Sequence, residues 1–306
     1  MDKPFLSIVI ANYNYGRYLE DAIQSVVTQE LSDKVEVIIC DAASTDNSVD
    51  VIKKYANGLP SNVSYYDWRD SRCEKSDTQL ITWWCSERDG GQSSAFNKGF
   101  AHARGVWLTW LNADDILLPG TINAIWSLVE KKDSAEWVTG NMLSFDSESG
   151  KIIRVNWGPH MQPPFLRKKH SIISVFGPTS FFRRTLYEKL GPIDENMHFA
   201  MDTELWARFT MAGVQQTRLR HLCWGFRVHE ESKTGGEQSA TIIERRDNET
   251  KYWREKTGCR FEVSLRNPWY LMWLIWRVID GSCLVRYLMR VRYEGVSLES
   301  LKGNLK

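Results

Sequence analysis

The fold is decided by residues 6–46, which read LSIVIANYNYGRYLEDAIQSVVTQELSDKVEVIICDAASTD. Short apolar runs at the start of this stretch and at 35–40 are rich in β-branched residues, as is typical of buried strands. Between them, apolar residues recur at helical spacing over 19–27. Strand, helix and strand in this order predict a right-handed βαβ unit with parallel strands. Asn12 and Asp41 then follow the carboxyl ends of the two strands, where open α/β sheets bind ligands.

The same alternation continues along the chain. By their apolar patterns, the further expected elements are a helix around 49–55, a helix at 95–103, a strand at 106–111, a helix from 118 through 129, a strand at 137–143 and a helix at 204–212. The strand at 106–111 brings Asn112 to Asp115 to the edge that already holds Asn12 and Asp41. Residues 144–175 contain three prolines and a basic run, and we expect a mobile loop there.

Composition excludes several classes of protein. The chain has 306 residues with 39 Lys plus Arg and 38 Asp plus Glu, so its formal net charge is +1. No global attraction to nucleic acid follows, and no nucleic-acid partner is expected. Hydrophobic residues at 42% and charged residues at 25% are close to globular averages. The six cysteines lie far apart in the sequence, which argues against a disulfide framework or a zinc site. The start of the chain lacks a cleavable signal pattern, so we expect a cytoplasmic protein.

Five ordered segments carry a resemblance to a known family. They are SIVIANYN at 7–14, DAASTD at 41–46, DGGQSSAFNKG at 89–99, LNADD at 111–115 and MDTELW at 201–206. In this order they resemble the motifs of family 2 glycosyltransferases. The resemblance implies a GT-A fold, an α/β architecture with a Rossmann-like, mostly parallel central sheet flanked by helices. It further implies a catalytic domain over 1–258, with a nucleotide-sugar half at about 1–115 and an acceptor half at about 116–235, followed by a C-terminal helical appendage at 259–306.

The resemblance also implies contacts to a nucleotide-sugar donor, UDP-linked in our interpretation, and to its acceptor. The substrate-binding residues that it implies are Ala11, Tyr13, Asp41, Ser44, Asp89, Asn97, Lys98, Asn112, Ala113, Glu204 and Lys233. Asp41 stands where family members bind the base, because a carboxylate accepts hydrogen bonds from ring N–H groups. Family members often have a second Asp after it, whereas Ala42 stands here. The alternative is a plain turn aspartate.

The segment Asn112 to Asp115 resembles the Asp-x-Asp motif that holds a divalent cation against the donor diphosphate. Hard oxygen ligands suit Mg²⁺ or Mn²⁺, and few protein ligands are needed when phosphate oxygens and water complete the shell. By motif position Asp114 is the metal ligand and Asp115 a supporting residue. Asn112 replaces the first acid and is expected to face the ribose. The alternative for the whole segment is a solvated acidic turn.

Two further residues complete the implied chemistry. Asp202 matches the position of the catalytic base, which takes the proton of the acceptor hydroxyl as its oxygen attacks the anomeric carbon. Glu204 is the second candidate for this role, and the alternative for Asp202 is an N-cap. His229 lies in a late segment, 227–233, whose His and Lys approach the metal or the diphosphate in the family. A structural hydrogen bond is the alternative for His229.

These residues predict an inverting, metal-dependent glycosyltransferase. It would move a sugar from a nucleotide to a hydroxyl of a glycan or polyprenyl-linked acceptor in cell-surface polysaccharide or glycoconjugate assembly. The alternative is a catalytically silent sugar-nucleotide-binding scaffold of a glycan-assembly complex, suggested by the departures at Ala42, Asn112 and Met201. P-loop, serine-hydrolase and dinucleotide-binding signatures are missing from the sequence.

The appendage carries a separate signal. Residues 268–279 are apolar but interrupted by Arg277, and they fall short of the roughly 20 residues needed to span a bilayer. The tryptophans of this stretch, Trp269, Trp273 and Trp276, share a helical stripe typical of a membrane interface. After Gly281, one face of a second expected helix carries the apolar residues Leu284, Tyr287, Leu288 and Val291. Another face of this helix carries Arg286 and Arg290. We expect peripheral binding at the cytoplasmic face of the inner membrane. Packing onto the catalytic domain or a homodimer contact is the alternative.

Overall fold

The computed structural model describes residues 3–31, 34–58, 81–159, 175, 177–232, 240–259 and 265–300. The chain forms two compact units. The first comprises Met1–Trp126 and Phe181–Glu195, and the second Ser127–Ser180 and Asn196–Lys306. Each is described by itself below.

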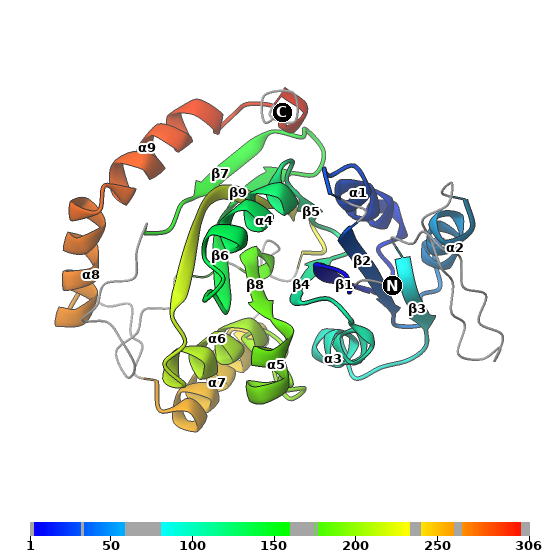
Figure 1. The fold of residues 1–306 in the computed structure, drawn as a ribbon, viewed down its shortest axis with the longest axis horizontal. Coiled ribbons are helices and arrows are strands. Elements are labelled where there is room, and N and C mark those ends of the chain that lie inside the picture. The colour runs from blue at the N-terminus through cyan, green and yellow to red at the C-terminus, as the bar shows by residue number, and fades with distance from the viewer. Residues whose placement is uncertain are drawn as a thin grey trace. The chain divides into compact units, whose positions relative to one another are not determined.

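The first unit is built on a sheet with strand order β3-β2-β1-β4-β8 (Figure 1). In chain order its elements are β1 (Leu6–Asn12), α1 (Gly16–Val27), β2 (Val35–Asp41), α2 (Ser48–Gly58), β3 (Ile81–Ser86), α3 (Gln92–His102), β4 (Trp107–Asn112), β5 (Ile116–Leu117), the start of α4 (Thr121–Lys131), β8 (Ser180–Arg183) and α5 (Arg184–Leu190). β1 to β4 are mutually parallel, and β8 joins β4 in the antiparallel sense. The mostly parallel sheet that the apolar runs predict is therefore present.

Strand register brings the polar strand ends together. Asn12 pairs with Asp41 across β1 and β2, and Asp41 with Ser86 across β2 and β3. On the other side of β1, Ala11 pairs with Asn112 at the end of β4. The strands are buried on both faces, so their apolar runs are nearly continuous and their first polar residues mark the edge of the sheet. This edge is the one that the sequence predicts.

The second unit is built around a long central strand. Its elements are the rest of α4, β6 (Trp137–Asp146), β7 (Ile152–Asn156), a 3₁₀ turn (Gly177–Thr179), α6 (Met201–Met211), β9 (Gln216–Val228), α7 (Ala240–Thr257), α8 (Pro268–Ile279) and α9 (Ser282–Tyr293). β6 pairs with β7 in the antiparallel and with β9 in the parallel sense. Trp137 of β6 stacks on Trp206 of α6 with ring centroids 5.6 Å apart, which joins helix and sheet in one core.

The structure corrects the expectation of a loop over 144–175. β6 continues to Asp146, and β7 follows it at Ile152–Asn156. Only two residues of β7 are buried, and Arg154 interrupts its pattern, so the apolar signal of this edge strand is weak. Four further strands, β3, β5, β8 and β9, are absent from the sequence-based prediction. Residues 160–174, including the basic run at 167–170, lie outside the described residues.

Candidate active site

Two loops interlock at the sheet edge of the first unit. Asn14 and Ala43 have positive φ angles of 56° and 55°, so both loops turn sharply after their strands. The backbone N–H of Asn14 donates to Ser44 Oγ at 2.8 Å, and that of Thr45 donates to Asn14 Oδ1 at 2.9 Å. Gly16 begins α1 so close to the second loop that a Cβ there would lie 2.8 Å from the Ser48 nitrogen. The loops therefore hold each other in place.

Asp41 is the centre of this arrangement. Its side chain is buried, and each carboxylate oxygen accepts two hydrogen bonds. Oδ1 accepts from Asn12 Nδ2 at 2.6 Å and from Ser44 Oγ at 2.5 Å, while Oδ2 accepts from the Ser44 nitrogen at 3.0 Å and from Ser86 Oγ at 2.6 Å. These four bonds use the acceptor capacity of a carboxylate. In this structure Asp41 organises the loop, and contact with a base stays a prediction that requires one hydroxyl to turn away.

The end of β4 forms a second polar cluster. Asn112 Oδ1 accepts from Gln92 Nε2 at 2.7 Å, and Asn112 Nδ2 donates to Asp115 Oδ2 at 2.8 Å. Asp115 is completely buried, whereas Asp114 is partly exposed. Of the two neighbouring carboxylates, the one that the motif assigns to the metal is thus the one that solvent reaches.

The donor set at Asp114 fits a hard divalent cation, because a partly exposed carboxylate at a strand end supplies the oxygen that Mg²⁺ or Mn²⁺ prefers. Within the described part of the chain, no group of three or more His, Cys, Asp and Glu residues is arranged to hold a metal. A cation bound at Asp114 therefore needs ligands from the donor phosphates and water, in keeping with the predicted role of this segment.

Two predicted donor contacts, Asp89 before α3 and Lys98 within it, have partners in the protein. Asp89 Oδ1 accepts from the Gly91 nitrogen at 2.8 Å, and burial raises the pKa of the Asp89 carboxyl. Lys98 Nζ lies 2.6 Å from Glu87 Oε1, and although burial opposes it, this hydrogen bond raises the pKa of Lys98. The partners of both side chains are thus residues of the same segment.

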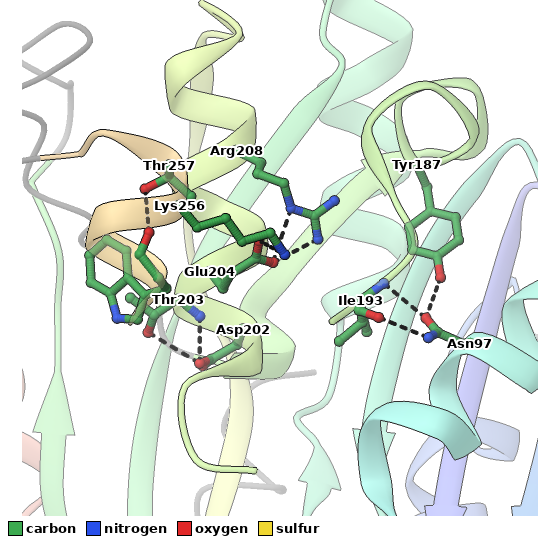
Figure 2. A network of polar contacts seen from close by, with 10 residues as sticks. Asn97, Tyr187, Ile193, Asp202, Thr203, Glu204, Arg208, Lys256 and Thr257 are labelled. Atoms are coloured by element: carbon green, nitrogen blue, oxygen red, sulfur yellow. Dashed lines mark hydrogen bonds and ion pairs between the residues drawn. The ribbon is translucent and has the colours of Figure 1, made fainter. Parts of the chain in front are cut away.

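Asn97 makes four hydrogen bonds within the first unit, and its contact with the donor stays a prediction (Figure 2). Its Oδ1 accepts from the Tyr187 hydroxyl at 2.7 Å and from the Ile193 nitrogen at 2.9 Å. Its Nδ2 donates to the Ile193 carbonyl and to Glu195 Oε1, both at 2.9 Å. Two accepted and two donated bonds use all that an amide offers. Asn97 therefore ties α3 to the segment after α5.

The other predicted contacts of this unit differ in exposure. Tyr13 is 60% exposed beside Asn12, whereas Ala113 is buried and its backbone N–H donates to the Ala11 carbonyl at 3.3 Å. Ala11 is partly exposed. Tyr13 is thus free to change its orientation, while Ala11 and Ala113 can offer only backbone groups.

In the second unit, Asp202 lies in the first turn of α6 (Figure 2). Asp202 Oδ1 accepts from the Thr203 nitrogen at 2.6 Å and from Thr203 Oγ1 at 3.2 Å. Burial raises the pKa of the Asp202 carboxyl, and the bonds from Thr203 oppose this rise. α6 has no side-chain cap from Ala200, and the bonds of Asp202 go to its immediate neighbour. The arrangement leaves Asp202 with a poorly stabilised charge, which suits a proton acceptor.

Glu204, predicted as a substrate contact and as the second candidate base, is instead part of a buried ionic cluster. The side chain is fully buried, and Oε2 accepts from Arg208 Nε at 3.0 Å and Nη2 at 2.7 Å. Oε1 lies 3.2 Å from Lys256 Nζ of α7. This carboxylate lies between two cations in the interior and contacts no solvent. Figure 2 shows how this cluster joins α6 to α7.

The structure says little about His229 and Lys233, the two residues near the end of β9 that are predicted to contact the metal or the diphosphate. The backbone N–H of His229 donates to Ser232 Oγ at 3.0 Å, and the Ser232 N–H donates back to the His229 carbonyl at 3.0 Å. These bonds close a turn, and the imidazole is partly exposed. Lys233 lies outside the described residues. Metal or phosphate binding by these two residues stays a prediction.

Comparison with known proteins identifies the family. The family model described as "Glycosyl transferase family 2" matches residues 7–191, more than half of the chain. The chain belongs to glycosyl transferase family 2. The predicted resemblance is thereby confirmed, and relatives named as glycosyltransferases are consistent with the predicted enzyme class.

Relatives of this glycosyltransferase are found in several bacteria. An uncharacterized glycosyltransferase of Nostoc sp. is 32% identical over 197 residues, which are 62% of this chain and 54% of that protein. The minor teichoic acid biosynthesis protein GgaB of Bacillus subtilis is 26% identical over 167 residues, 50% of this chain and 16% of that protein. The chain therefore spans about half the length of the first relative and a small part of the second.

Solved structures show the same fold. TarS 1-349 of S. aureus in complex with UDP has a TM-score of 0.56 at 16% identity, covering 74% of this chain and 61% of that chain. The mannosyltransferase PcManGT of Pyrobaculum calidifontis in complex with GDP-Man and Mn²⁺ has a TM-score of 0.53 at 16% identity, covering 100% of this chain and 86% of that chain. The expected GT-A fold is confirmed.

One residue that organises the second unit of this glycosyltransferase escaped the sequence analysis. Glu249 of α7 is buried, and its carboxylate accepts hydrogen bonds from the backbone nitrogens of His198 at 3.0 Å, Phe199 at 2.7 Å and Ala200 at 3.1 Å. It thus supplies, from another helix, the cap that α6 lacks. α7 is strongly polar, and nothing in its pattern distinguishes Glu249 from the exposed acids around it.

Proposed function

We propose that this glycosyltransferase is an inverting, metal-dependent enzyme that transfers one sugar from a nucleotide donor to a hydroxyl group. The observation that carries the proposal is the partly exposed Asp114, next to the hydrogen bond between Asn112 and the buried Asp115, on a sheet edge whose loops lock each other. Preorganised groups of this kind position a donor without reorganisation during the reaction. The neighbours that bind UDP or GDP-Man with Mn²⁺ support a nucleotide-sugar donor and a divalent cation.

The roles of the side chains follow from their chemistry. Asp114 would hold the cation, which when bound neutralises charge on the departing diphosphate. Asn112 and Asp115 keep the Asp114 loop in place. Asp202 would accept the proton of the acceptor hydroxyl, because burial raises its pKa above that of an ordinary aspartate and so makes it a stronger base. Inversion needs one base and one leaving group, and no covalent intermediate.

For the acceptor we propose a glycan or a polyprenyl-linked saccharide in cell-surface polysaccharide or glycoconjugate assembly, at the cytoplasmic face of the membrane. The relative named for minor teichoic acid biosynthesis supports this class of acceptor. The basic and apolar C-terminal helices support the location.

The test is a panel of UDP- and GDP-linked sugars incubated with the purified chain, with and without Mn²⁺, scored by release of nucleoside diphosphate. We expect release with one donor class and stimulation by the cation. Asp114→Ala is expected to abolish that stimulation, because loss of the ligand exposes the developing charge. Asp50→Ala, an exposed carboxylate of α2, is the matched control and should behave as the wild type.

Full activity in excess chelator would contradict the role of Asp114. Binding of a donor by calorimetry without release under any metal condition would instead favour a silent sugar-nucleotide-binding scaffold. The replacement of the first motif acid by Asn112 is the feature that favours this second function.

A further inference from the structure

Each of the two C-terminal helices of the second unit exposes an apolar face. On α8, Ile275, Val278 and Ile279 are 59%, 69% and 70% exposed, and Leu271 and Met272 are exposed beside them. On α9, the exposed apolar residues are Leu284, Tyr287, Leu288 and Val291, at 55% to 68%. Positions three and four apart on a helix share a face, so each set forms one stripe. An apolar surface of this size on a folded protein marks an interaction site.

The opposite sides of the helices are held by the protein. Arg277 of α8 is buried, and its Nη2 donates to the Trp157 carbonyl at 3.0 Å. Tyr293 at the end of α9 is buried, and beyond it Gly295 and Val296 exchange backbone hydrogen bonds with Ile152 of β7 at 2.7 and 2.9 Å. The helices therefore have a fixed orientation, and their exposed face is the one directed away from β7.

Arginines border the apolar face of α9. Arg290 and Arg292 lie on either side of the α9 stripe, and Arg292 is exposed. Burial, and after it the charges of Arg277, Arg290 and Arg154, lower the pKa of Arg286. Glu294 pairs with Arg290 at 2.8 Å and offsets part of the charge. The combination of an aliphatic face with a basic border is typical of helices that lie in a membrane interface.

The exposed face is aliphatic, which corrects the expectation of a tryptophan stripe. Trp269, Trp273 and Trp276 are only partly exposed, and Trp273 stacks with Tyr270 at a centroid distance of 5.6 Å and lies under the Arg277 guanidinium at 5.0 Å. These tryptophans therefore lie toward the side where Arg277 anchors α8. The residues that reach outward are those of the helical arc from Leu271 to Ile279.

We propose that the aliphatic face of α8 and α9 docks onto the surface of an anionic phospholipid bilayer, with the arginines of α9 at the headgroups. This deepens the proposed function, on whose membrane location it rests, by naming the surface and the lipid charge. Each helix has 12 residues, about 18 Å, which is too short to cross the hydrocarbon core and suits an in-plane position. Within the described ranges, no helix meets the length and hydropathy of a membrane span.

A bilayer fits this face better than a second copy of the chain. A two-fold dimer formed through the stripes would bring the arginine border of each copy near that of the other, because such an interface uses the same patch twice. Like charges placed together in this way repel. An anionic headgroup layer supplies the complementary charge, and each basic residue near it adds to the attraction.

The experiment is vesicle flotation of the full chain with vesicles of phosphatidylglycerol and phosphatidylcholine, and with phosphatidylcholine alone. We expect flotation with the anionic vesicles, weakened at high salt, and at least tenfold weaker binding to neutral ones. The variant Ile275→Glu/Leu288→Glu should bind at least tenfold less, because it places two carboxylates on the docking face. Ile243→Glu, at a 41% exposed position of α7, is the matched control and should float as the wild type.

Light scattering without vesicles measures the oligomeric state and so tests whether a second copy of the chain covers this face. A wild-type dimer that the double variant dissociates would assign the face to a second copy and overturn the proposal. Flotation of the double variant equal to wild type, or no flotation of the wild type, would also overturn it. Nucleoside diphosphate release measured without vesicles is read separately: it should be the same in the double variant, and its absence in both proteins would count against the proposed transfer reaction and not against docking.

Discussion

At the scale of single residues, Asp202 has a half-buried side chain that accepts hydrogen bonds from Thr203, and partial burial raises the pKa of its carboxyl above the ordinary value of 3.8. We expect Asp202→Asn to lower turnover by about 10² or more while the affinity for the donor stays unchanged, because general base catalysis contributes about 10² to 10⁴. Turnover is measured by product formation and affinity by calorimetry. Turnover at the wild-type rate would exclude Asp202 as the base.

The raised pKa of Asp202 also affects the stability of the protein. An acid whose pKa is higher in the folded than in the unfolded state costs folding free energy at pH values above its folded pKa, and this cost disappears as the pH falls to the unfolded value of 3.8. Asp202→Asn should therefore be more stable than the wild type at neutral pH, with the gain fading toward pH 3.8. Urea unfolding at several pH values checks this. A variant equally or less stable at neutral pH would contradict the assignment of an unfavourable buried charge.

Single residues also show where motif reasoning reaches its limit. The motifs correctly placed Asn12, Asp41 and Asn112 at one edge, because position after a buried strand fixes location. They could not specify partners. Asn97 and Glu204 match family positions, yet in the folded chain Asn97 bonds to Ile193 and Glu204 pairs with Arg208. Neither partner is visible in the one-dimensional pattern.

At the scale of secondary-structure elements, α7 fixes the start of α6 through Glu249. We expect Glu249→Ala to destabilise the protein by about 3 kcal/mol, since three backbone N–H groups lose a charged acceptor. Turnover should fall further than donor affinity, because the turn that precedes Asp202 loses its anchor. Thermal and urea unfolding measure the first effect and steady-state kinetics the second.

Glu244→Ala on the same helix is the control for this prediction, because Glu244 is exposed. Glu249→Gln removes the charge but keeps an oxygen that can accept from the Phe199 and Ala200 nitrogens. We therefore expect this variant to be more stable than Glu249→Ala and less stable than the wild type. Equal unfolding free energies for Glu249→Ala and Glu244→Ala would show that α7 does not hold α6.

Element prediction succeeded for three strands with unbroken apolar runs and failed for β9, whose pattern is interrupted. It also missed β3 and β8, although both are largely buried. β1, β2 and β4 are buried on both faces, so their sequences are unbroken apolar runs. β9 contains Arg218, whose guanidinium is buried against Thr139 and Asn141 of β6, with hydrogen bonds of 2.7 and 3.2 Å. Burial lowers the pKa of Arg218 to about 10. Because arginine usually lies at the surface, Arg218 interrupts the apolar pattern, and the strand is not predicted.

At the scale of the whole molecule, the two proposals assign donor binding and membrane docking to different units of the chain. Hydrogen exchange distinguishes them, because a ligand at ten times its dissociation constant slows exchange through the unbound form about tenfold. UDP or GDP with Mn²⁺ should protect the loops 12–16, 41–48 and 112–115 and leave 271–291 unchanged. Anionic vesicles should protect 271–291 and leave the three loops unchanged. Protection of 271–291 by the nucleotide alone would contradict docking by an independent surface, and unprotected loops at saturating nucleotide would contradict the donor site at the sheet edge.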